Sequence, residues 1–416
     1  MEKYSLLQLA KHALSGHKHW PQAWRSPEPK KSYDVIIIGG GGQGLATAYY
    51  LAKKYGITNV AVVEKGWLGG GNTGRNTTVV RSNYFYPEST DFFDHSLKMY
   101  ENLSLELNYN VMLSQGGILT LGHNGHDMEM LERWSNSLQL QGLDAEMMTT
   151  EQIKAHTPLI DTSRSARYPI CGGFIQRRGG VARHDAVAWG YARGADDLGV
   201  DIIQNCEVTG VRKSGDRVQG VETSRGYIKA DKVAFAVAGH TSVLGSMVGL
   251  ELPIVSQALQ AMVSEPVKPC LDGAVLSGAA HAYVSQSDRG EILIGGGADR
   301  HPSYGQRGNL PILEETLSAA LSLFPSFSRL KLMRQWAGIV DISPDSSPIL
   351  GKTPITGLYI SGGWGTGGFK AIPAGGDTLA YTIANDRPHE LIKPFGLERF
   401  VTGALIDEGA AAGVAH

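Results

Sequence analysis

The sequence predicts an α/β protein: a dinucleotide-binding domain assembled from separate stretches of chain, with a β-rich domain inserted between them. Three observations lead to this prediction. An apolar strand at 35–38 runs into a glycine-rich turn, and a second buried strand ends at Glu64 one helix later. Two further apolar strands, within 232–240 and 357–370, also run into glycine. Continuous apolar runs of this kind are typical of parallel strands covered on both faces.

The first turn carries a phosphate-binding pattern. Its glycines fill the three positions of G-x-G-x-x-G and two positions between them: Gly39, Gly41 and Gly44, with Gly40 and Gly42 in addition. The first glycine of the pattern permits the tight turn, the second lets the backbone approach a pyrophosphate, and the third lets helix and strand pack closely. A helix is expected over 45–55, with its N-terminal amide groups facing the phosphates.

Glu64 completes the unit. It follows the strand 60–63, about 20 residues beyond the glycines, where an acidic side chain accepts hydrogen bonds from a ribose 2′-hydroxyl. A carboxylate repels the 2′-phosphate of NADP, so the expected ligand is FAD or NAD.

The rest of the chain alternates between helices and short strands. Helices are expected at 88–107, 126–141, 185–198, 313–323 and 374–384, and strands of a separate sheet at 117–121, 167–174, 282–286 and 291–295. The expected domains are an N-terminal extension at 1–32, a nucleotide-binding domain at 33–110, 175–245 and 335–416, and a β-rich substrate domain at 111–174 and 246–334. The extension holds Trp20 and Trp24, which either pack on this chain or dock on another subunit.

Composition narrows the classes of function. A net charge of −2 argues against a nucleic-acid partner. No apolar run is long enough to span a membrane, and basic residues interrupt the N-terminus where a signal peptide has its apolar core, which favours the cytoplasm. The cysteines Cys171, Cys206 and Cys270 have the spacing of neither a metal site nor a disulfide framework, as expected in a reducing compartment.

Several segments resemble one family closely. They are 45–52, 64–72, 75–84, 183–193 and 363–370. Together they resemble the β subunits of heterotetrameric sarcosine oxidases, within the D-amino-acid oxidase class that has a glutathione-reductase-type FAD fold. The resemblance runs essentially from residue 1 to the terminal histidine. It implies the oxidative demethylation of sarcosine to glycine, with hydrogen peroxide formed from O₂ and the one-carbon unit released as formaldehyde or passed to tetrahydrofolate.

The resemblance also implies two flavins and three partner chains. FAD would be noncovalent, because the stretch 334–342 lacks the cysteine through which single-chain sarcosine oxidases attach it. FMN would be covalently joined to His184, near the boundary with the α subunit, and Arg177, Arg178 and Arg183 would form a basic cluster for a flavin phosphate. The α, γ and δ subunits would supply further sites, and no metal is expected on this chain.

The residues implied for FAD form a long set. They are Gly39, Gly40, Gly41, Gly42, Gly44, Glu64, Lys65, Asn72, Thr73, Arg75, Asn76, Thr77, Val208, Gly363, Gly365, Thr366, Gly368 and Lys370, while Arg183 and His184 are expected at FMN. Trp336 and Asp345 match a class motif and are expected to shape the pocket. Thr78 departs from the single-chain enzymes, which have an arginine there.

The substrate site needs cations for a small carboxylate. By resemblance, Arg81 binds that carboxylate, and Lys370, at the end of the second glycine-rich turn, lies close to the flavin. His281 and Tyr283 alternate along 280–284, so both are expected on one face of a strand, facing the substrate.

Two other functions remain open at this point. The chain could be a self-sufficient FAD oxidase or dehydrogenase for another secondary amine, such as dimethylglycine or proline. It could also be a flavin-bearing scaffold that only positions partner subunits.

Overall fold

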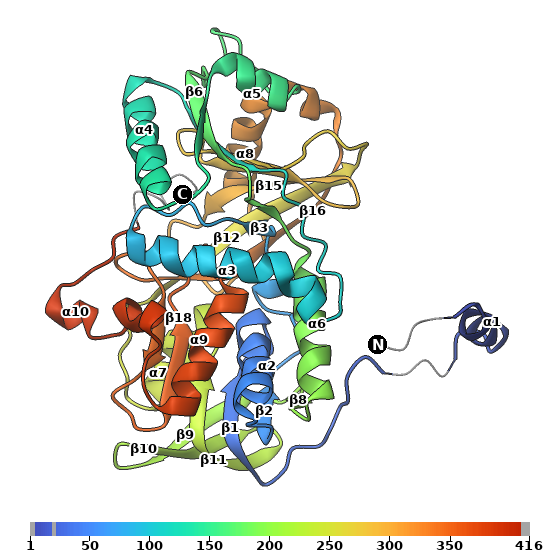
Figure 1. The fold of residues 1–416 in the computed structure, drawn as a ribbon, viewed down its shortest axis with the longest axis vertical. Coiled ribbons are helices and arrows are strands. Elements are labelled where there is room, and N and C mark those ends of the chain that lie inside the picture. The colour runs from blue at the N-terminus through green and yellow to red at the C-terminus, as the bar shows by residue number, and fades with distance from the viewer. Residues whose placement is uncertain (1–4, 19–21, 409–416) are drawn as a thin grey trace.

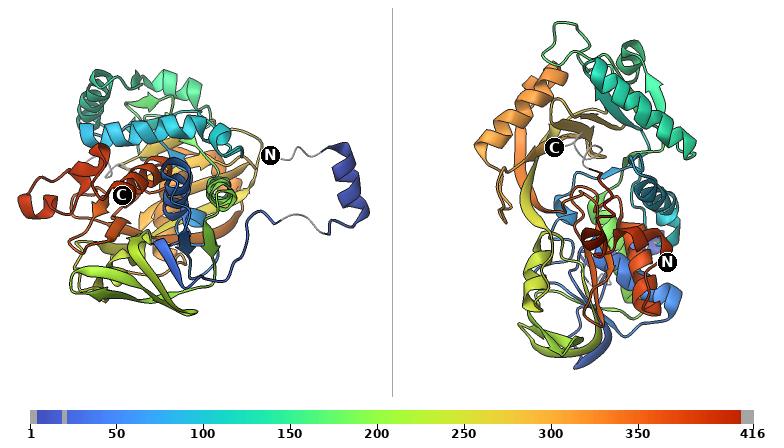
Figure 2. Two further views of the ribbon diagram at one scale, coloured as in Figure 1. Left: turned by 60° about the horizontal axis from the view of Figure 1, so that its bottom comes forward. Right: turned by 90° about the vertical axis from the view of Figure 1, so that its left-hand side faces the viewer.

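Two β-sheets, one in each half of the molecule, organise the fold (Figures 1 and 2). The computed structural model describes residues 5–18 and 22–408. Within these residues each large sheet has eight strands, and a short two-stranded pair lies between the halves. The helices are α1 (Leu6–Leu14), α2 (Gly42–Tyr55), α3 (Pro87–Glu106), α4 (Gly125–Leu140), α5 (Thr150–His156), α6 (His184–Asp197), α7 (Thr241–Met247), α8 (Leu310–Leu323), α9 (Ile372–Asn385) and α10 (Arg399–Thr402).

The first sheet is mainly parallel. Its path runs β17 (Ile349–Lys352), β18 (Leu358–Gly362), β11 (Gly226–Phe235), β1 (Ser32–Ile38), β2 (Val60–Val63) and β8 (Asp201–Ile203), with β9 (Val208–Ser214) and β10 (Arg217–Thr223) added beside β11. Along β1, Ile37 joins the core under α2, α6 and α9, whereas Ile36 joins the core on the opposite face. Burial on both faces explains why the second half of β1, residues 35–38, has no polar alternation.

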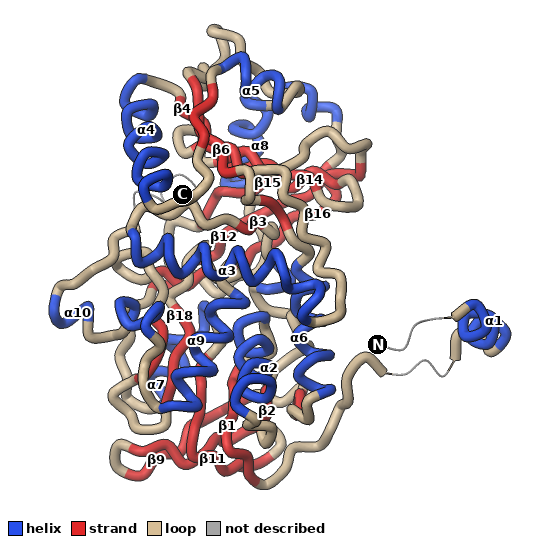
Figure 3. The backbone as a smooth tube through the Cα atoms, in the orientation of Figure 1, coloured by secondary structure: helices blue, strands red, loops and turns tan. Residues whose placement is uncertain are grey.

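Helices α2, α6 and α9 cover one face of this sheet (Figure 3). Helix α2 begins at Gly42, three residues before the expected start, because the extended Gly41 is its N-cap. The helix ends where Gly56 takes a left-handed conformation, with φ 65°.

The second sheet is mainly antiparallel. Its order is β16 (Leu332–Ile342), β12 (Val255–Pro266), β15 (Glu291–Ala298), β14 (Ala282–Gln286), β13 (Ala274–Ser277), β4 (Ile118–Gly122), β6 (Gly172–Gln176) and β5 (Glu146–Met148). Helix α8 packs on β14 and β15, while α4 and α5 pack near β6. The β16 strand pairs with β12 over its length, so residues 335–342 lie in this sheet rather than with the nucleotide-binding strands.

Helix α3 lies across the middle of the molecule (Figure 1). It buries Phe92, Phe93, Leu97 and Tyr100 and packs against α9 of the first half. The two-stranded pair β3 (Val79–Val80) and β7 (Gly180–Val181) lies just before α3 and α6 in the chain. Residues 81–86 connect β3 to α3, so the position of this connection depends on both.

The N-terminal extension has two distinct parts. Helix α1 stands away from the body in Figure 1, with Leu6, Leu7 and Leu14 more than 80% exposed. Trp24 is partly buried against the core of this chain, whereas Trp20 lies outside the described residues. Among the residues that the structure describes, no helix has the length and apolar character needed to span a bilayer.

The predicted fold class is confirmed: an α/β dinucleotide-binding half carries an inserted antiparallel-β half. The strand expected at 167–174 begins only at Gly172. Pro169 accounts for the difference, because proline has no N–H to donate to a strand ladder.

Candidate functional site

One cavity of about 550 Å³ is lined by residues from both sheets. Many of the residues expected at FAD line it: Gly39, Gly41, Gly42, Glu64, Lys65, Asn72, Thr73, Arg75, Asn76, Thr77, Val208, Gly365, Thr366, Gly368 and Lys370. Gly40, Gly44 and Gly363 do not line it. Ligand pockets are commonly 300–1,000 Å³, so the volume suits an elongated cofactor with room for a small substrate.

The first glycine turn needs its glycines for two different reasons. Gly39 has φ 111°, and a Cβ atom there would lie 2.3 Å from the carbonyl oxygen of Ala236. Gly44 packs so tightly that a Cβ would meet the Gly39 carbonyl oxygen at 2.1 Å. At Gly41 a Cβ would meet only Thr73 Oγ1 within 4 Å, at 3.1 Å, so this residue leaves the backbone open to the cavity at the start of α2.

Glu64 is held in place by the backbone. The Gly40 N–H donates to Oε2 and the Gly66 N–H donates to Oε1, both at 2.8 Å. The carboxylate borders the cavity at the end of β2. Its acceptor lone pairs are therefore oriented before any ligand arrives.

The loop 72–77 joins the glycine turn to the second sheet. Asn72 donates to the Ile339 carbonyl at 2.5 Å and accepts the Ile339 N–H at 2.9 Å, which fixes the loop to β16. Trp336 Nε1 donates to the Arg75 carbonyl at 2.7 Å. Trp336 therefore supports this loop without lining the cavity.

Tyr283 reaches the same cavity from β14. Its hydroxyl lies 2.8 Å from Thr77 Oγ1, and burial raises its pKa to about 12. At neutral pH it is therefore a neutral hydrogen-bonding group.

His281 lies elsewhere. The prediction that His281 and Tyr283 lie on one face of a strand is therefore wrong. His281 lies in the turn before β14 with φ 49°, is exposed, and donates its backbone N–H to the Gly278 carbonyl at 3.0 Å. A left-handed residue closing this turn breaks the two-residue alternation of a strand.

Arg81 and Lys370 bring two buried basic side chains to the cavity. Each is 5% exposed. Arg81 Nη1 donates to the carbonyl and Oδ1 of Asn83, both at 2.9 Å, and its guanidinium lies 4.6 Å from the Tyr84 ring centroid. Its other N–H groups make no hydrogen bond with the described residues and remain available to a carboxylate.

Lys370 has few partners. Its Nζ donates to the Thr366 carbonyl at 3.0 Å. Burial, with a smaller contribution from the positive charge of Arg81, holds the pKa of Lys370 well below its usual range. The site therefore makes Lys370 easier to deprotonate than an exposed lysine.

Helix α3 fixes the backbone on which Lys370 lies. Ser96 Oγ donates to the Lys370 carbonyl at 2.7 Å, and the Tyr100 hydroxyl donates to the Phe369 carbonyl at 2.6 Å. Both donors lie on one helix face, four residues apart.

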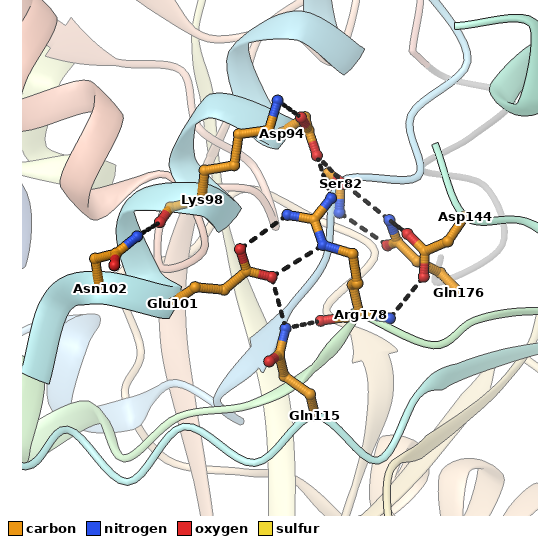
Figure 4. A network of polar contacts seen from close by, with 9 residues as sticks. All are labelled: Ser82, Asp94, Lys98, Glu101, Asn102, Gln115, Asp144, Gln176 and Arg178. Carbon is orange, nitrogen blue, oxygen red and sulfur yellow. Dashed lines mark hydrogen bonds and ion pairs between the residues drawn. The ribbon is translucent and has the colours of Figure 1, made fainter. Parts of the chain in front are cut away.

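A polar network fixes the chain next to Arg81 (Figure 4). The Ser82 N–H donates to Gln176 Oε1 at 3.0 Å, and Gln176 Nε2 donates to Ser82 Oγ at 2.8 Å. Arg178 then binds Asp94 and Glu101 of α3, at 3.2 and 2.9 Å. Arg178 thus ties α3 to the loop after β6.

The expected basic cluster for a flavin phosphate is not present, because each arginine has its own acidic partner. Arg177 pairs with Glu146 at 2.6 Å, Arg178 with Glu101 and Asp94, and Arg183 with Asp185 at 2.8 Å and Asp288 at 3.2 Å. The charges of these arginines are neutralised within the chain.

His184 opens α6, away from the cavity lining. The side chain is half-buried, and burial lowers its pKa. Its Nδ1 is buried and makes no hydrogen bond with the described residues. The neutral imidazole is therefore the favoured form at neutral pH.

Two acidic residues take roles that their sequence positions do not reveal. Asp341, which interrupts the apolar run at 337–342, lines the cavity and is 1% exposed, and burial raises its pKa to about 7. Its only sequence signal is a carboxylate within an apolar strand. Asp345, expected at the pocket, lies outside the lining and forms a buried ion pair with Arg399 at 2.7 Å.

The comparisons with known proteins agree with this geometry. The model of the family "FAD dependent oxidoreductase" matches residues 34–382. The chain is 52% identical to "Sarcosine oxidase subunit beta" of Rhodobacter capsulatus over 416 residues, the whole of both chains. It is 55% identical to the protein of the same name from Arthrobacter sp over 393 residues, 94% of this chain and 97% of the relative.

Among solved structures, the L-proline dehydrogenase of P. horikoshii superimposes with a TM-score of 0.85 at 26% identity, covering 91% of this chain and all of that one. The family match, the two full-length relatives and the dinucleotide cavity lead to one conclusion. The chain belongs to the family of FAD-dependent oxidoreductases and, within it, to the sarcosine oxidase β subunits.

Proposed function

We propose that this chain is the β subunit of a multi-subunit oxidase that demethylates sarcosine to glycine. The observation that carries the proposal is the pair of buried side chains, Arg81 and Lys370, at one dinucleotide-sized cavity. A site of this kind recognises a small carboxylate and holds it beside a cofactor.

The residues present fit FAD. A helix N-terminus and an open backbone at Gly41 suit the pyrophosphate, and the oriented carboxylate of Glu64 suits the ribose. The absence of cysteine from 334–342 favours noncovalent binding. Bound there, FAD supplies a hydride acceptor for the N-methyl carbon of the substrate.

Arg81 binds the substrate carboxylate through the N–H groups that Asn83 does not occupy. Lys370 has a second task. Sarcosine carries an ammonium group at neutral pH, and only the neutral amine can lose a hydride. We assign the Nζ of Lys370, whose charged form is disfavoured by burial and by the charge of Arg81, as the acceptor of that proton. The lysine then bears a charge next to the carboxylate, which stabilises the bound substrate.

Tyr283 closes the site from the second sheet. Its hydrogen bond to Thr77 spans the two halves of the molecule, and burial keeps the phenol neutral beside the substrate. The oxidised substrate is an iminium, which water converts to glycine and formaldehyde; tetrahydrofolate is the alternative one-carbon acceptor.

We also propose that His184 holds FMN covalently. A neutral imidazole is the nucleophilic form, and the burial of Nδ1 leaves Nε2 as the nitrogen for the bond. Joining Nε2 to the flavin 8α carbon would release two protons and two electrons, which the flavin would take up and pass to O₂. FMN there would take up the two electrons removed from sarcosine by way of FAD and pass them to O₂, which with two protons gives hydrogen peroxide. The side chains of Arg177, Arg178 and Arg183 are paired with acidic residues of this chain. The phosphate of FMN therefore needs cations from other residues. The α, γ and δ partner subunits and a cytoplasmic location belong to the same proposal.

The first experiment is to isolate the complex from its native source and precipitate it with acid. Flavin retained in the pellet on the peptide of His184, with FAD in the supernatant, is the expected result. FAD alone, entirely in the supernatant, refutes the covalent link. His184→Ala abolishes the retained flavin, whereas His281→Ala, at an exposed histidine outside the cavity, retains it.

The fold shared with L-proline dehydrogenase favours a second candidate, a dehydrogenase for another secondary amine. Anaerobic reduction by sarcosine, dimethylglycine and proline separates the two. Fastest reduction by sarcosine supports the oxidase, and fastest reduction by either other amine supports the alternative. Normal flavin content without reduction by any of them indicates a scaffold.

A further inference from the structure

The C-terminal segment (residues 399–408) is fastened to the connection after β16 by buried contacts. Arg399 donates to both carboxylate oxygens of Asp345, at 2.7 and 2.9 Å, and these two side chains are at most 2% exposed. The Ile406 N–H also donates to Asp345, at 3.2 Å, and the Glu408 N–H donates to the Asp345 carbonyl at 3.1 Å. Ser347 Oγ donates to the Ile406 carbonyl at 2.6 Å. These contacts fix where Glu408 lies.

Glu408 places a buried carboxylate at the start of α3. The residue is 2% exposed; the Phe85 N–H donates to Oε2 at 3.1 Å and the Tyr86 N–H to Oε1 at 3.0 Å. Tyr86 is the N-cap of α3 and provides no side-chain cap of its own. The distant carboxylate therefore satisfies amide groups at the positive end of that helix.

The amide groups held by Glu408 follow Arg81 by only four and five residues. Between them, Arg81 bonds to Asn83 and lies over Tyr84, whose ring stacks on Phe93 at a centroid distance of 3.8 Å. The chain from 81 to 86 is thus a short, well-packed connection. On its other side, the network of Figure 4 holds Ser82.

A second cavity, of about 40 Å³, lies next to the large cavity of about 550 Å³ and is lined in part by Glu408. Arg81, Ser89, Trp364 and Glu408 are among its lining residues, and Arg81 and Trp364 also line the large cavity. The positive charge of Arg81 opposes the rise in the pKa of Glu408 that burial causes. Arg81 therefore borders both cavities, whereas Glu408 borders only the small one.

We propose that Glu408 is a positioning residue for Arg81: by holding the Phe85 and Tyr86 amide groups, it keeps the guanidinium where it binds a substrate carboxylate. This inference rests on the carboxylate-binding role of Arg81 in the proposed function. The C-terminal segment then contributes to substrate binding without touching the substrate. Its effect is on affinity, because an arginine that occupies several orientations binds a carboxylate less often in the productive one.

The test uses the intact complex with Arg81→Ala and three further substitutions in this chain. Glu408→Ala removes the carboxylate. Glu408→Gln keeps one oxygen acceptor in a side chain of the same size and provides a variant if the first fails to fold. Asp407→Ala, at the exposed neighbouring position, is the matched control. FAD content and melting temperature are recorded for each.

We expect Glu408→Ala to raise the KM for sarcosine and the Kd for acetate about tenfold, since charge-assisted hydrogen bonds to the backbone are lost. The kcat stays within threefold, Glu408→Gln is intermediate, and Asp407→Ala matches the parent. Acetate reports carboxylate binding through the flavin absorption spectrum, independently of turnover. Adding Glu408→Ala to Arg81→Ala should cause no further loss of acetate binding.

The outcomes separate this inference from the proposed function. Loss of acetate binding in Arg81→Ala but not in the Glu408 variants overturns the positioning role and leaves the proposed function intact. Unchanged acetate binding in Arg81→Ala and in the Glu408 variants overturns the positioning role of Glu408 and the proposed carboxylate-binding role of Arg81. A Glu408 variant with a lowered melting temperature and unchanged KM and Kd shows a structural role alone, which also overturns the inference.

Discussion

Replacing Arg81 by methionine tests the chemistry of the site most directly. Methionine keeps much of the buried volume and removes the charge. Arg81 is 5% exposed, and its guanidinium hydrogen-bonds only to Asn83 within the described residues. Its remaining N–H donors are therefore free to bind a ligand. The substitution should therefore weaken carboxylate binding without emptying the FAD site.

The size of the effect follows from the lost hydrogen bonds. Each hydrogen bond to a charged group contributes about 1.5–3 kcal/mol, so two bonds at the lower limit give about 3 kcal/mol. That energy is roughly a hundredfold in kcat/KM. Arg81→Lys keeps a point charge but loses the planar pair of donors, and we expect roughly a tenfold loss.

The assay compares kcat and KM for sarcosine with those for a secondary amine that has no carboxylate. The Arg81→Met substitution should act mainly on sarcosine, while FAD content stays at the parental level. An unchanged KM for sarcosine, or an equal loss for the two amines, refutes the role of Arg81 in carboxylate recognition.

Three further perturbations test other parts of the structure. Lys370→Met should raise the melting temperature at pH 7. The pKa of Lys370 is lowered on folding, so the unfolded parent chain binds more protons than the folded one and the lysine destabilises the fold. The rise in melting temperature should therefore shrink as the pH approaches the ordinary lysine pKa. An unchanged or opposite pH trend in thermal unfolding contradicts this. Arg399→Met leaves the buried charge of Asp345 unpaired and should cost about 3–5 kcal/mol in urea unfolding; a cost below about 1 kcal/mol would argue against a buried pair. Gly41→Ala should fold but bind FAD at least about tenfold more weakly, whereas Gly44→Ala should lower the yield of folded protein, because only the latter clashes with backbone; FAD titration and soluble yield measure the two.

The nucleotide-binding half was predictable because its signals are local. A continuous apolar strand, a glycine turn and an acid at the next strand end specify one supersecondary unit, and the structure has each of them at the expected place. The lining by Tyr283 was likewise foreseeable from its strand. His281 was not, because the choice between strand and turn depends on how tightly β13 and β14 are joined.

Long-range pairing accounts for the other differences. Arg177, Arg178 and Arg183 are close in sequence, which predicts a basic cluster, but each has an acidic partner in a distant segment, and Arg183 also pairs with the neighbouring Asp185. The contacts of Asp345 and Glu408 with residues 54 and 323 positions away likewise have no local sequence signal. Such partners become visible only once the chain is folded.

Helix α3 carries a consequence for how substrate preference can change. It directly follows the Arg81 connection, and it holds the backbone of the Lys370 turn through Ser96 and Tyr100. The backbone segments that carry Arg81 and Lys370 are therefore both held by helix α3, whereas Tyr283 belongs to the second sheet. Under the proposed function, mutations in that second sheet reshape the space around the amine while the spacing of Arg81 and Lys370 stays constant. The architecture thus allows divergence toward new N-substituted amino acids without rebuilding the part of the site that every amino acid shares.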